Sequence, residues 1–347
     1  MTFRTTGQSN MASRTNPPNY IIASAPFRIS FAGGGTDLPA MYEREGGAVF
    51  STAIDKHIYV TVKRLSSFFG KSYRLNYSET EIVQSVDDIK NSIARECLKL
   101  VPCEPPLYIG VIADIPTASG LGASSSFAVS LLSALHVLRD ERVSPAQLAE
   151  EASTVEINML NRPIGKQDQY AAAFGGLNYL GFLSNGRVTV EPQSMRPQEV
   201  DKLFTSMLMF WTGISRDAGQ VLETQNARTE INIKRLRFMK EQAEELRRMT
   251  LGGIDVKAFG DVLNSGWQNK RALATSISTD QIDGWYNAGI QAGAYGGKLC
   301  GAGGGGFLMF LADPRQHESI RAALSDLQEL KVGYEPNGVR VVSQGIS

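Results

Sequence analysis

The chain has 347 residues, of which 42% are hydrophobic and 20% charged, the balance of an ordinary globular protein. Its 35 basic side chains match its 35 acidic ones, which argues against a nucleic acid or an anionic membrane surface held by bulk charge. At this length one hydrophobic core rarely serves the whole chain, so two domains are expected.

The cysteine content and the absence of long apolar runs bear on the cellular compartment and on membrane association. The three cysteines, Cys97, Cys103 and Cys300, are odd in number and irregularly spaced, which predicts reduced thiols and a cytoplasmic protein. Residues 1–19 are polar, without the apolar stretch of a secretory signal, and are expected to form a disordered tail. No apolar run approaches the roughly 18 residues that a bilayer requires, so no membrane partner is expected.

Strand and helix patterns are interleaved without a regular βαβ period, which predicts an α+β fold. In chain order, β-branched and aromatic segments predict strands as two short runs around Pro26 within 20–34, then at 48–65, 73–77, 105–116, a hairpin around 184–186, a strand beginning at 204, 305–312 and 338–344. Helical spacing predicts helices at 85–101, 126–139, 144–160, 227–249, 255–274, 279–293 and 315–330. Composition changes near 195–203, a predicted connector that divides an N-terminal domain, 20–200, from a C-terminal domain, 201–347.

A run of small residues, SGLGASSS at 119–126, lies between a predicted strand and a predicted helix. Gly120 and Gly122 permit positive φ angles and let the backbone approach a ligand closely. The unpaired amides of the first helical turn favour an anion, and phosphate is the obvious candidate. Taken alone, the run is equally compatible with a linker that packs a helix close to a sheet. It matches neither a Walker A loop nor a dinucleotide-binding fingerprint.

Three stretches, in this order, resemble the motifs of the GHMP kinase superfamily, which includes galactokinase, homoserine kinase and mevalonate kinase. They are APFRISFAGGGTDLP (25–39), PTASGLGASSSF (116–127) and KLCGAGGGGF (298–307). The second is similar to the phosphate loop of that superfamily, and the third to its C-terminal glycine loop. The resemblance implies a two-domain α+β fold with an N-terminal domain of the ribosomal-protein-S5 domain 2-like type, a ferredoxin-like C-terminal domain, and ATP between them.

The resemblance also implies roles for individual residues. Asp168 falls where the family places the aspartate that orients and deprotonates the sugar hydroxyl, and Arg28 falls where a cation pairs with it. Ser124 and Glu156 match the family's ligands for Mg²⁺. The residues implied to hold the phosphates of ATP are Pro116, Ser119, Gly120, Leu121, Gly122, Ala123, Ser124, Ser125 and Ser126. Those implied to contact the sugar are Gly33, Gly34, Gly35, Thr36, Asp37, Gly303 and Gly304, with Lys166 and Arg216 as candidates for a cation that meets a substrate phosphate.

The segments FAGGGTD, GKQDQYAAAFGGLNYLGF and WTGISRDAG resemble the branch of the superfamily that phosphorylates heptose 7-phosphate at its anomeric hydroxyl. This implies an ATP- and Mg²⁺-dependent sugar kinase whose 1,7-bisphosphate product enters nucleotide-activated heptose synthesis. Two alternatives stay open: a 1-kinase for an unphosphorylated sugar such as L-fucose or galactose, and a non-catalytic binding protein of the same fold. The sequence does not decide the oligomeric state and leaves a homodimer open.

Overall fold

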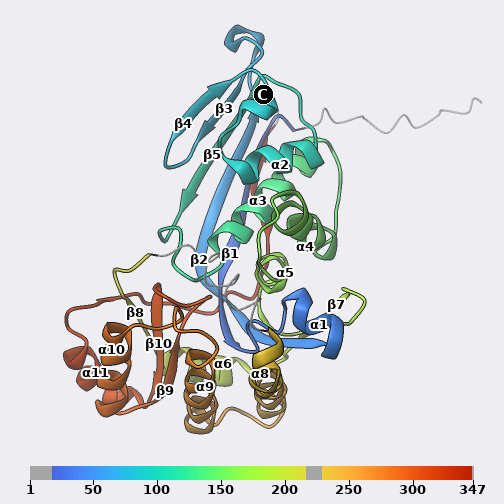
Figure 1. The fold of residues 1–347 in the computed structure, drawn as a ribbon. Coiled ribbons are helices and arrows are strands. Elements are labelled where there is room, and N and C mark those ends of the chain that lie inside the picture. The colour runs from blue at the N-terminus through green and yellow to red at the C-terminus, as the bar shows by residue number, and fades with distance from the viewer. Residues whose placement is uncertain (1–17, 216–228, 346–347) are drawn as a thin grey trace, which may run out of the picture.

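Two β-sheets organise the chain (Figure 1), and the computed structural model describes residues 18–215 and 229–345. The strands of the first sheet are β1 (Tyr20–Ala32), β2 (Gly47–Arg64), β3 (Tyr73–Asn76), β4 (Thr80–Val83), β5 (Leu107–Ala113), β6 (Leu177–Phe182), β7 (Val188–Pro192) and β12 (Arg340–Gly345). They are ordered β12-β1-β2-β5-β3-β4, and β6 pairs with both β2 and β7. The last strand of the chain therefore lies beside the first.

Strand β2 is long enough to serve two partners on one edge. Its first half pairs with β6, its second half pairs with β5, and β1 runs antiparallel along its other edge. The sequence predicts two short runs around Pro26, whereas β1 is one continuous strand whose register with β2 shifts between Pro26 and Phe27. Proline has no amide hydrogen for a ladder, and the irregularity accommodates it.

Helix α3 is the central helix of this half. The helices here are α1 (Pro39–Glu45), α2 (Ser92–Leu100), α3 (Ala123–Leu138), α4 (Pro145–Ser153) and α5 (Gln167–Phe174). Helix α3 packs on β1 and β2, and nearly all of its residues are buried. Its sequence is small and apolar around the whole circumference, which is the composition of a helix enclosed on every side.

The second sheet has the order β11-β8-β10-β9 and lies at the lower left of Figure 1. Its strands are β8 (Met207–Trp211), β9 (Ala294–Leu299), β10 (Phe307–Ala312) and β11 (Gln328–Glu329), and the helices of this half are α6 (Pro197–Thr205), α8 (Thr229–Leu251), α9 (Val256–Arg271), α10 (Asp280–Gln291) and α11 (His317–Ala323). The two halves share packed side chains. Phe31 of β1 meets Phe259 of α9 edge to face, with ring centroids 5.2 Å apart.

Several elements differ from the sequence predictions. The predicted connector at 195–203 contains α6, which starts with Pro197 at its first position and buries Leu203. The helix predicted at 85–101 begins at Ser92, because Asn91 caps it by accepting a hydrogen bond from the Ala94 amide. The helix predicted at 144–160 changes into a π-helical turn at Thr154–Met159. In the described ranges, no helix is both long and apolar enough to cross a bilayer.

Candidate active site

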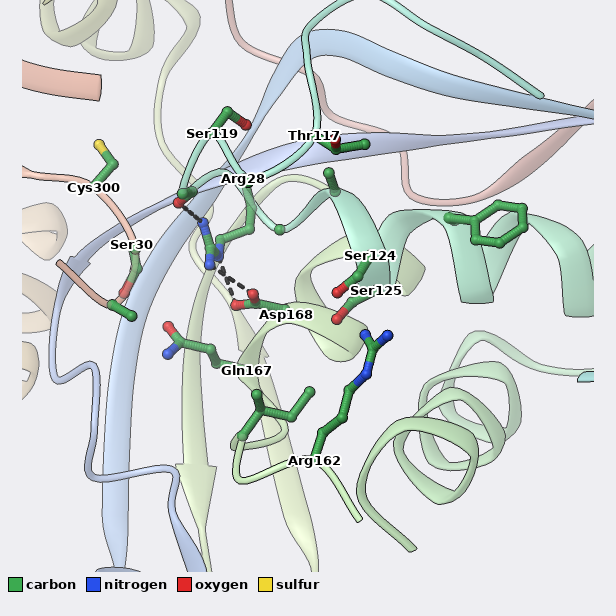
Figure 2. Close-up of a pocket in the computed structure, with 18 of the residues that line it drawn as sticks. Arg28, Ser30, Thr117, Ser119, Ser124, Ser125, Arg162, Gln167, Asp168 and Cys300 are labelled. Atoms are coloured by element: carbon green, nitrogen blue, oxygen red, sulfur yellow. Dashed lines mark hydrogen bonds and ion pairs between the residues drawn. The ribbon is translucent and has the colours of Figure 1, made fainter. Parts of the chain in front are cut away.

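A cavity of about 1090 Å³ lies between the two halves (Figure 2). Part of its lining is apolar and comes from the first sheet and its helices: Ile58, Ile93, Val111, Ile115 and Phe127. Another part is polar and comes from β1 and the turn after it, the start of α5 and the second half of the chain: Arg28, Ser30, Asp37, Gln167, Asp168, Lys270 and Lys298. A ligand with both a flat apolar portion and several charged groups fits such a lining.

The small-residue run forms a wall of this cavity where α3 begins. Gly122 precedes the helix in the left-handed conformation (φ 83°, ψ 23°), and the helix starts at Ala123. The amides of the first turn lack helical partners, so they can bind an anion. Gly120 has φ 79°, and a Cβ there would lie 2.6 Å from the carbonyl oxygen of Cys300. Glycine at this position therefore lets the loop before α3 touch the C-terminal glycine loop.

The three consecutive serines of this run, at positions 124–126, point in different directions. Ser124 is exposed and lines the cavity. Ser125 is buried and donates to Oε2 of Glu156 at 2.6 Å. Ser126 donates to the Pro26 carbonyl at 2.8 Å, so its hydroxyl fastens α3 to β1 rather than facing a ligand. The predicted phosphate-binding residues that line the cavity are Pro116, Ser119, Gly120, Gly122, Ala123, Ser124 and Ser125, whereas Leu121 and Ser126 do not line it.

Arg28 and Asp168 form the central polar contact of the cavity (Figure 2). Arg28 Nε donates to Asp168 Oδ1 at 2.7 Å and Nη2 donates to Oδ2 at 2.6 Å, while Nη1 donates to the Gly120 carbonyl at 2.7 Å. The arginine side chain is 5% exposed and that of the aspartate 25%. A bidentate pair of this kind fixes both groups, and it leaves the aspartate as the member that a ligand can reach.

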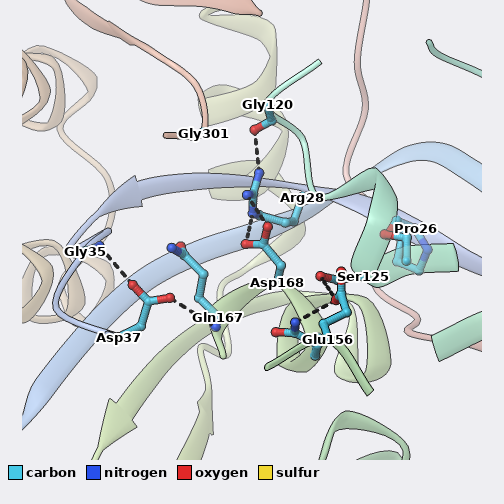
Figure 3. A network of polar contacts seen from close by, with 12 residues as sticks. Pro26, Arg28, Gly35, Asp37, Gly120, Ser125, Glu156, Gln167, Asp168 and Gly301 are labelled. Carbon is cyan, nitrogen blue, oxygen red and sulfur yellow. Dashed lines mark hydrogen bonds and ion pairs between the residues drawn. The ribbon is translucent and has the colours of Figure 1, made fainter. Parts of the chain in front are cut away.

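Asp37 is held beneath the glycine turn that follows β1 (Figure 3). Its Oδ1 accepts from the Gly35 amide at 2.9 Å and its Oδ2 from the Gln167 amide at 3.3 Å. Burial is the main cause that raises the pKa of this carboxyl. A Cβ at Gly165 would lie 2.1 Å from Asp37 Oδ2, so this glycine makes room for the carboxylate, a role that no sequence motif indicates.

Glu156 is fully buried in the π-helical turn, and protein donors already satisfy its two oxygens. Its Oε2 accepts from Ser125 at 2.6 Å and from Gln169 Nε2 at 2.7 Å, and Oε1 accepts from Arg162 Nη1 at 3.0 Å. Figure 3 shows the contact with Ser125, whereas the family resemblance pairs Glu156 with Ser124. Arg162 lines the cavity whereas Glu156 does not, so the Arg162 guanidinium links the buried carboxylate to the cavity.

Comparisons with known proteins bear on this geometry. The family model described as "GHMP kinases N terminal domain" matches residues 83–176, and the model "GHMP kinases C terminal" matches 225–329, together more than half of the chain. The chain belongs to the GHMP kinase family. The matched N-terminal region contains the predicted phosphate loop, Glu156 and Asp168, and the matched C-terminal region contains the third glycine motif.

Individual relatives of this GHMP kinase cover most of its length. It is 29% identical over 315 residues to the D-glycero-alpha-D-manno-heptose 7-phosphate kinase of Campylobacter jejuni, covering 88% of this chain and 93% of the relative. It is 25% identical over 342 residues to the galactokinase of Pyrococcus furiosus, covering 88% and 92%. The crystal structure of a D-glycero-D-manno-heptose 1-phosphate kinase from Bacteroides thetaiotaomicron superposes with a TM-score of 0.76 at 26% identity, over 93% of this chain and 99% of that one. The two-domain GHMP kinase fold expected from the motifs is thereby confirmed.

The structure separates the predicted sugar contacts of this GHMP kinase into two groups. Gly34, Gly35, Asp37 and Gly303 line the cavity. Thr36 is fully buried, with its hydroxyl within hydrogen-bond distance of the Gly33 and Ala48 carbonyls, and so holds the glycine turn against β2. Gly33 packs so closely on β2 that a Cβ would lie 1.9 Å from the Ala48 carbonyl oxygen. Gly304 donates its amide to the Ile277 carbonyl and does not line the cavity.

The two predicted phosphate-binding cations of this kinase, Lys166 and Arg216, have different outcomes. Lys166 Nζ donates to Glu150 at 3.0 and 3.2 Å and to the Gly186 carbonyl at 3.1 Å, and it does not line the cavity. Arg216 lies outside the described residues. Among the described residues, the cations that line the cavity besides Arg28 are Arg162, Lys270 and Lys298. Lys298 opens the third glycine motif, yet its sequence position alone does not reveal which way it points.

Proposed function

We propose that this GHMP kinase transfers the γ-phosphate of ATP to the anomeric C1 hydroxyl of D-glycero-D-manno-heptose 7-phosphate. The observation that carries the proposal is the Arg28–Asp168 pair at the cavity, beside the amides of the phosphate loop. A fixed carboxylate next to an anion-binding helix start supplies the two requirements of phosphoryl transfer, an oriented acceptor hydroxyl and a held phosphate. The heptose-kinase relatives supply the choice of sugar.

In this proposal Asp168 orients the acceptor hydroxyl and takes its proton. Both carboxylate oxygens already accept from Arg28, but an ionised carboxylate has about four acceptor positions, so a sugar hydroxyl can still donate to it. An anomeric hydroxyl is more acidic than an ordinary alcohol, which brings it closer to the proton affinity of a carboxylate. Arg28 keeps Asp168 in place and balances the charge that develops during transfer.

The nucleotide is assigned to the α3 side of the cavity. The first-turn amides from Gly122 to Ser125 bind the phosphates, and Ser124 adds an exposed hydroxyl. The apolar lining formed by Ile93, Val111 and Ile115 suits the flat face of an adenine ring. Such a reaction takes place where ATP is abundant, and the three free cysteines agree with a cytoplasmic setting.

The donor types at Glu156 suit Mg²⁺, and the ion would have to replace hydrogen bonds that both carboxylate oxygens make in the structure. A hydroxyl and a carboxylate are oxygen donors of the type this ion prefers, with nucleotide phosphates as further ligands. In the structure the Arg162 guanidinium already holds a positive charge 3.0 Å from Glu156 Oε1, at the edge of the cavity. Glu156, with Ser124 or Ser125, would hold the ion, which would neutralise phosphate charge during transfer.

Release of ADP, measured with a panel of sugars, tests the proposal. Turnover that requires heptose 7-phosphate, with a ³¹P signal of an anomeric phosphate in the product, supports it. Turnover of unphosphorylated heptose, L-fucose or galactose at comparable kcat/KM would assign the protein to the second class of sugar 1-kinases. Binding of ATP without turnover of any sugar would favour a non-catalytic binding protein.

A further inference from the structure

Two buried lysines from the second half of the chain line the polar part of the cavity. Lys270 of α9 is 6% exposed and Lys298 of β9 is 7% exposed. Lys298 Nζ donates to the carbonyls of Ser30 at 2.5 Å and Phe31 at 3.1 Å, and Lys270 Nζ donates to the Gly301 carbonyl. Within residues 18–215 and 229–345, neither ammonium group has a carboxylate oxygen within 4.0 Å.

Such an arrangement is costly without a further partner. Buried charges in proteins are normally paired, because removing an ammonium group from water loses its solvation. Burial lowers the pKa of Lys270 to about 8 and that of Lys298 to about 7. Each ammonium has three donors, and main-chain carbonyls take two of those on Lys298 and one on Lys270. An anion bound beside them would use the remaining donors and offset the buried charge.

A third polar group points to the same place. Ser30 is 5% exposed, lines the cavity, and its hydroxyl has no hydrogen-bond partner among the described residues. The carbonyl of this serine is the one that Lys298 contacts. A buried hydroxyl without a partner is uncommon in folded proteins, and here it belongs to the residue whose carbonyl accepts from a cavity-lining lysine.

The position of these groups matches the length of a sugar phosphate. Arg28 and Ser30 are two residues apart on β1, so their side chains share one face of the strand and are separated by about 6.6 Å along it. Asp168 is fixed on Arg28. A seven-carbon sugar that offers its C1 hydroxyl to Asp168 therefore extends its far end along β1 toward Ser30 and the two lysines.

We propose that Lys270, Lys298 and the Ser30 hydroxyl form an anion subsite that binds the phosphate already carried by the sugar substrate, at the end opposite the reacting hydroxyl. This inference rests on the proposed function and deepens it, because it explains how the enzyme distinguishes a sugar phosphate from the free sugar. It assigns to the second half of the chain the recognition of substrate that Lys166 cannot supply from its contact with Glu150.

Steady-state kinetics of Lys298→Met, Lys270→Met and Ser30→Ala test the subsite, with heptose 7-phosphate, free heptose and ATP each varied in turn. Loss of a charged hydrogen bond predicts an increase of about 10- to 100-fold in KM for the sugar phosphate in each lysine variant, and a smaller increase in Ser30→Ala. The KM values for ATP and for the free sugar are expected to stay within about twofold. Lys202→Met is the matched control, because Lys202 also donates its ammonium to a carbonyl, that of Ile254, outside the cavity.

The melting temperature provides a second readout. Replacing an unpaired buried charge by methionine removes a desolvation cost, so the lysine variants are expected to melt at or above the wild-type temperature while binding the sugar phosphate less tightly. If a lysine variant does not fold, Ser30→Ala still tests the site, since it removes one atom.

The outcomes separate the subsite from the proposed function. If the wild type turns over heptose 7-phosphate and both lysine variants keep its KM, the subsite is wrong and the proposed function stands. A rise in the KM for ATP without one for the sugar phosphate assigns the lysines to the nucleotide and overturns the subsite. If the wild type prefers a free sugar, the proposed substrate and the subsite are both wrong.

Discussion

Arg28 and Asp168 are 140 residues apart in the sequence and face each other through two parallel hydrogen bonds of 2.7 and 2.6 Å. Strand β1 supplies the arginine and the first turn of α5 supplies the aspartate. Because the arginine is nearly enclosed while a quarter of the aspartate side chain is exposed, the pair presents a carboxylate, rather than a guanidinium, to the cavity.

Asp168→Asn tests the role of that carboxylate. The amide keeps the shape but cannot take a proton, so kcat is expected to fall by about 10²- to 10⁴-fold, while the dissociation constant for ATP changes little. A coupled ADP-release assay and nucleotide titration measure the two quantities. Asp283→Asn is the matched control, since Asp283 is also paired with an arginine, Arg271, but does not line the cavity. Turnover at the wild-type rate would remove Asp168 from its proposed role.

Gly122→Val tests the phosphate loop. The residue has φ 83°, and its Cβ would approach Arg28 Cγ at 3.3 Å and Asp168 Oδ2 at 3.5 Å. Strain there is expected to raise the KM for ATP about tenfold or more. Gly186→Val is the control, because Gly186 has a similar φ of 80° in open surroundings. Equal effects of the two substitutions on the KM for ATP would contradict the assignment of the loop.

Arg162 and Glu156 provide a test of the proposed metal site. Removing the guanidinium in Arg162→Ala frees Glu156 Oε1. Half-maximal binding of Mn²⁺ is therefore expected at a severalfold lower Mn²⁺ concentration. Electron paramagnetic resonance in the presence of ATP measures this binding. Glu156→Gln is expected to raise that concentration about tenfold. Arg95→Ala, which breaks the contact with Glu96 outside the cavity, should leave it unchanged. Unchanged Mn²⁺ binding in both site variants would show that the metal binds elsewhere.

His136 makes the stability of the fold dependent on pH. Burial lowers the pKa of its ring, but hydrogen bonds to Glu151 at 2.7 Å and Glu141 at 2.6 Å outweigh burial and raise the pKa above 6.5. The charged ring therefore stabilises the protein fully below pH 6.5, and this contribution is lost as the pH rises through the higher, folded-state pKa.

In the variant His136→Gln the side chain at position 136 is neutral at every pH. Comparing the stability of this variant with that of the wild type therefore reveals the contribution of the charged ring. Its melting temperature is expected to fall below that of the wild type by about 2–4 °C more at pH 6 than at pH 9, as measured by scanning calorimetry. A difference that is the same at both pH values, or larger at pH 9, would contradict the assignment.

The sequence predicts the parts of the site whose backbone conformation requires a particular residue type, such as glycine at a positive φ angle. Gly120 and Gly122 mark the turn before α3 because only glycine adopts these φ angles at no cost. The family motifs correctly bring Arg28 together with Asp168. Side-chain direction is less accessible, since neighbouring serines of one helical turn point to a cavity, to a carboxylate and to a strand.

Contacts between distant segments are what sequence reasoning misses. Lys166 lies two residues before Asp168, yet Glu150 of the adjacent helix holds its ammonium away from the cavity. Lys298 faces the cavity because of the register of β9 with β10, which the sequence does not encode locally. Segment 195–203 looks like a connector because it is polar, although the burial of Leu203 stabilises it as a helix.

Because Tyr20 of β1 pairs with Gly345 of β12, one edge of β1 gains its partner only late in synthesis. Until β12 has been synthesised, the amides and carbonyls on one edge of β1 lack hydrogen-bond partners. At ordinary translation speeds the interval between the two strands is on the order of tens of seconds. An unpaired strand edge in a nascent chain can pair with other chains and so favours aggregation. We expect a variant truncated before Arg340 to leave this edge of β1 unpaired and to aggregate more readily than the wild type.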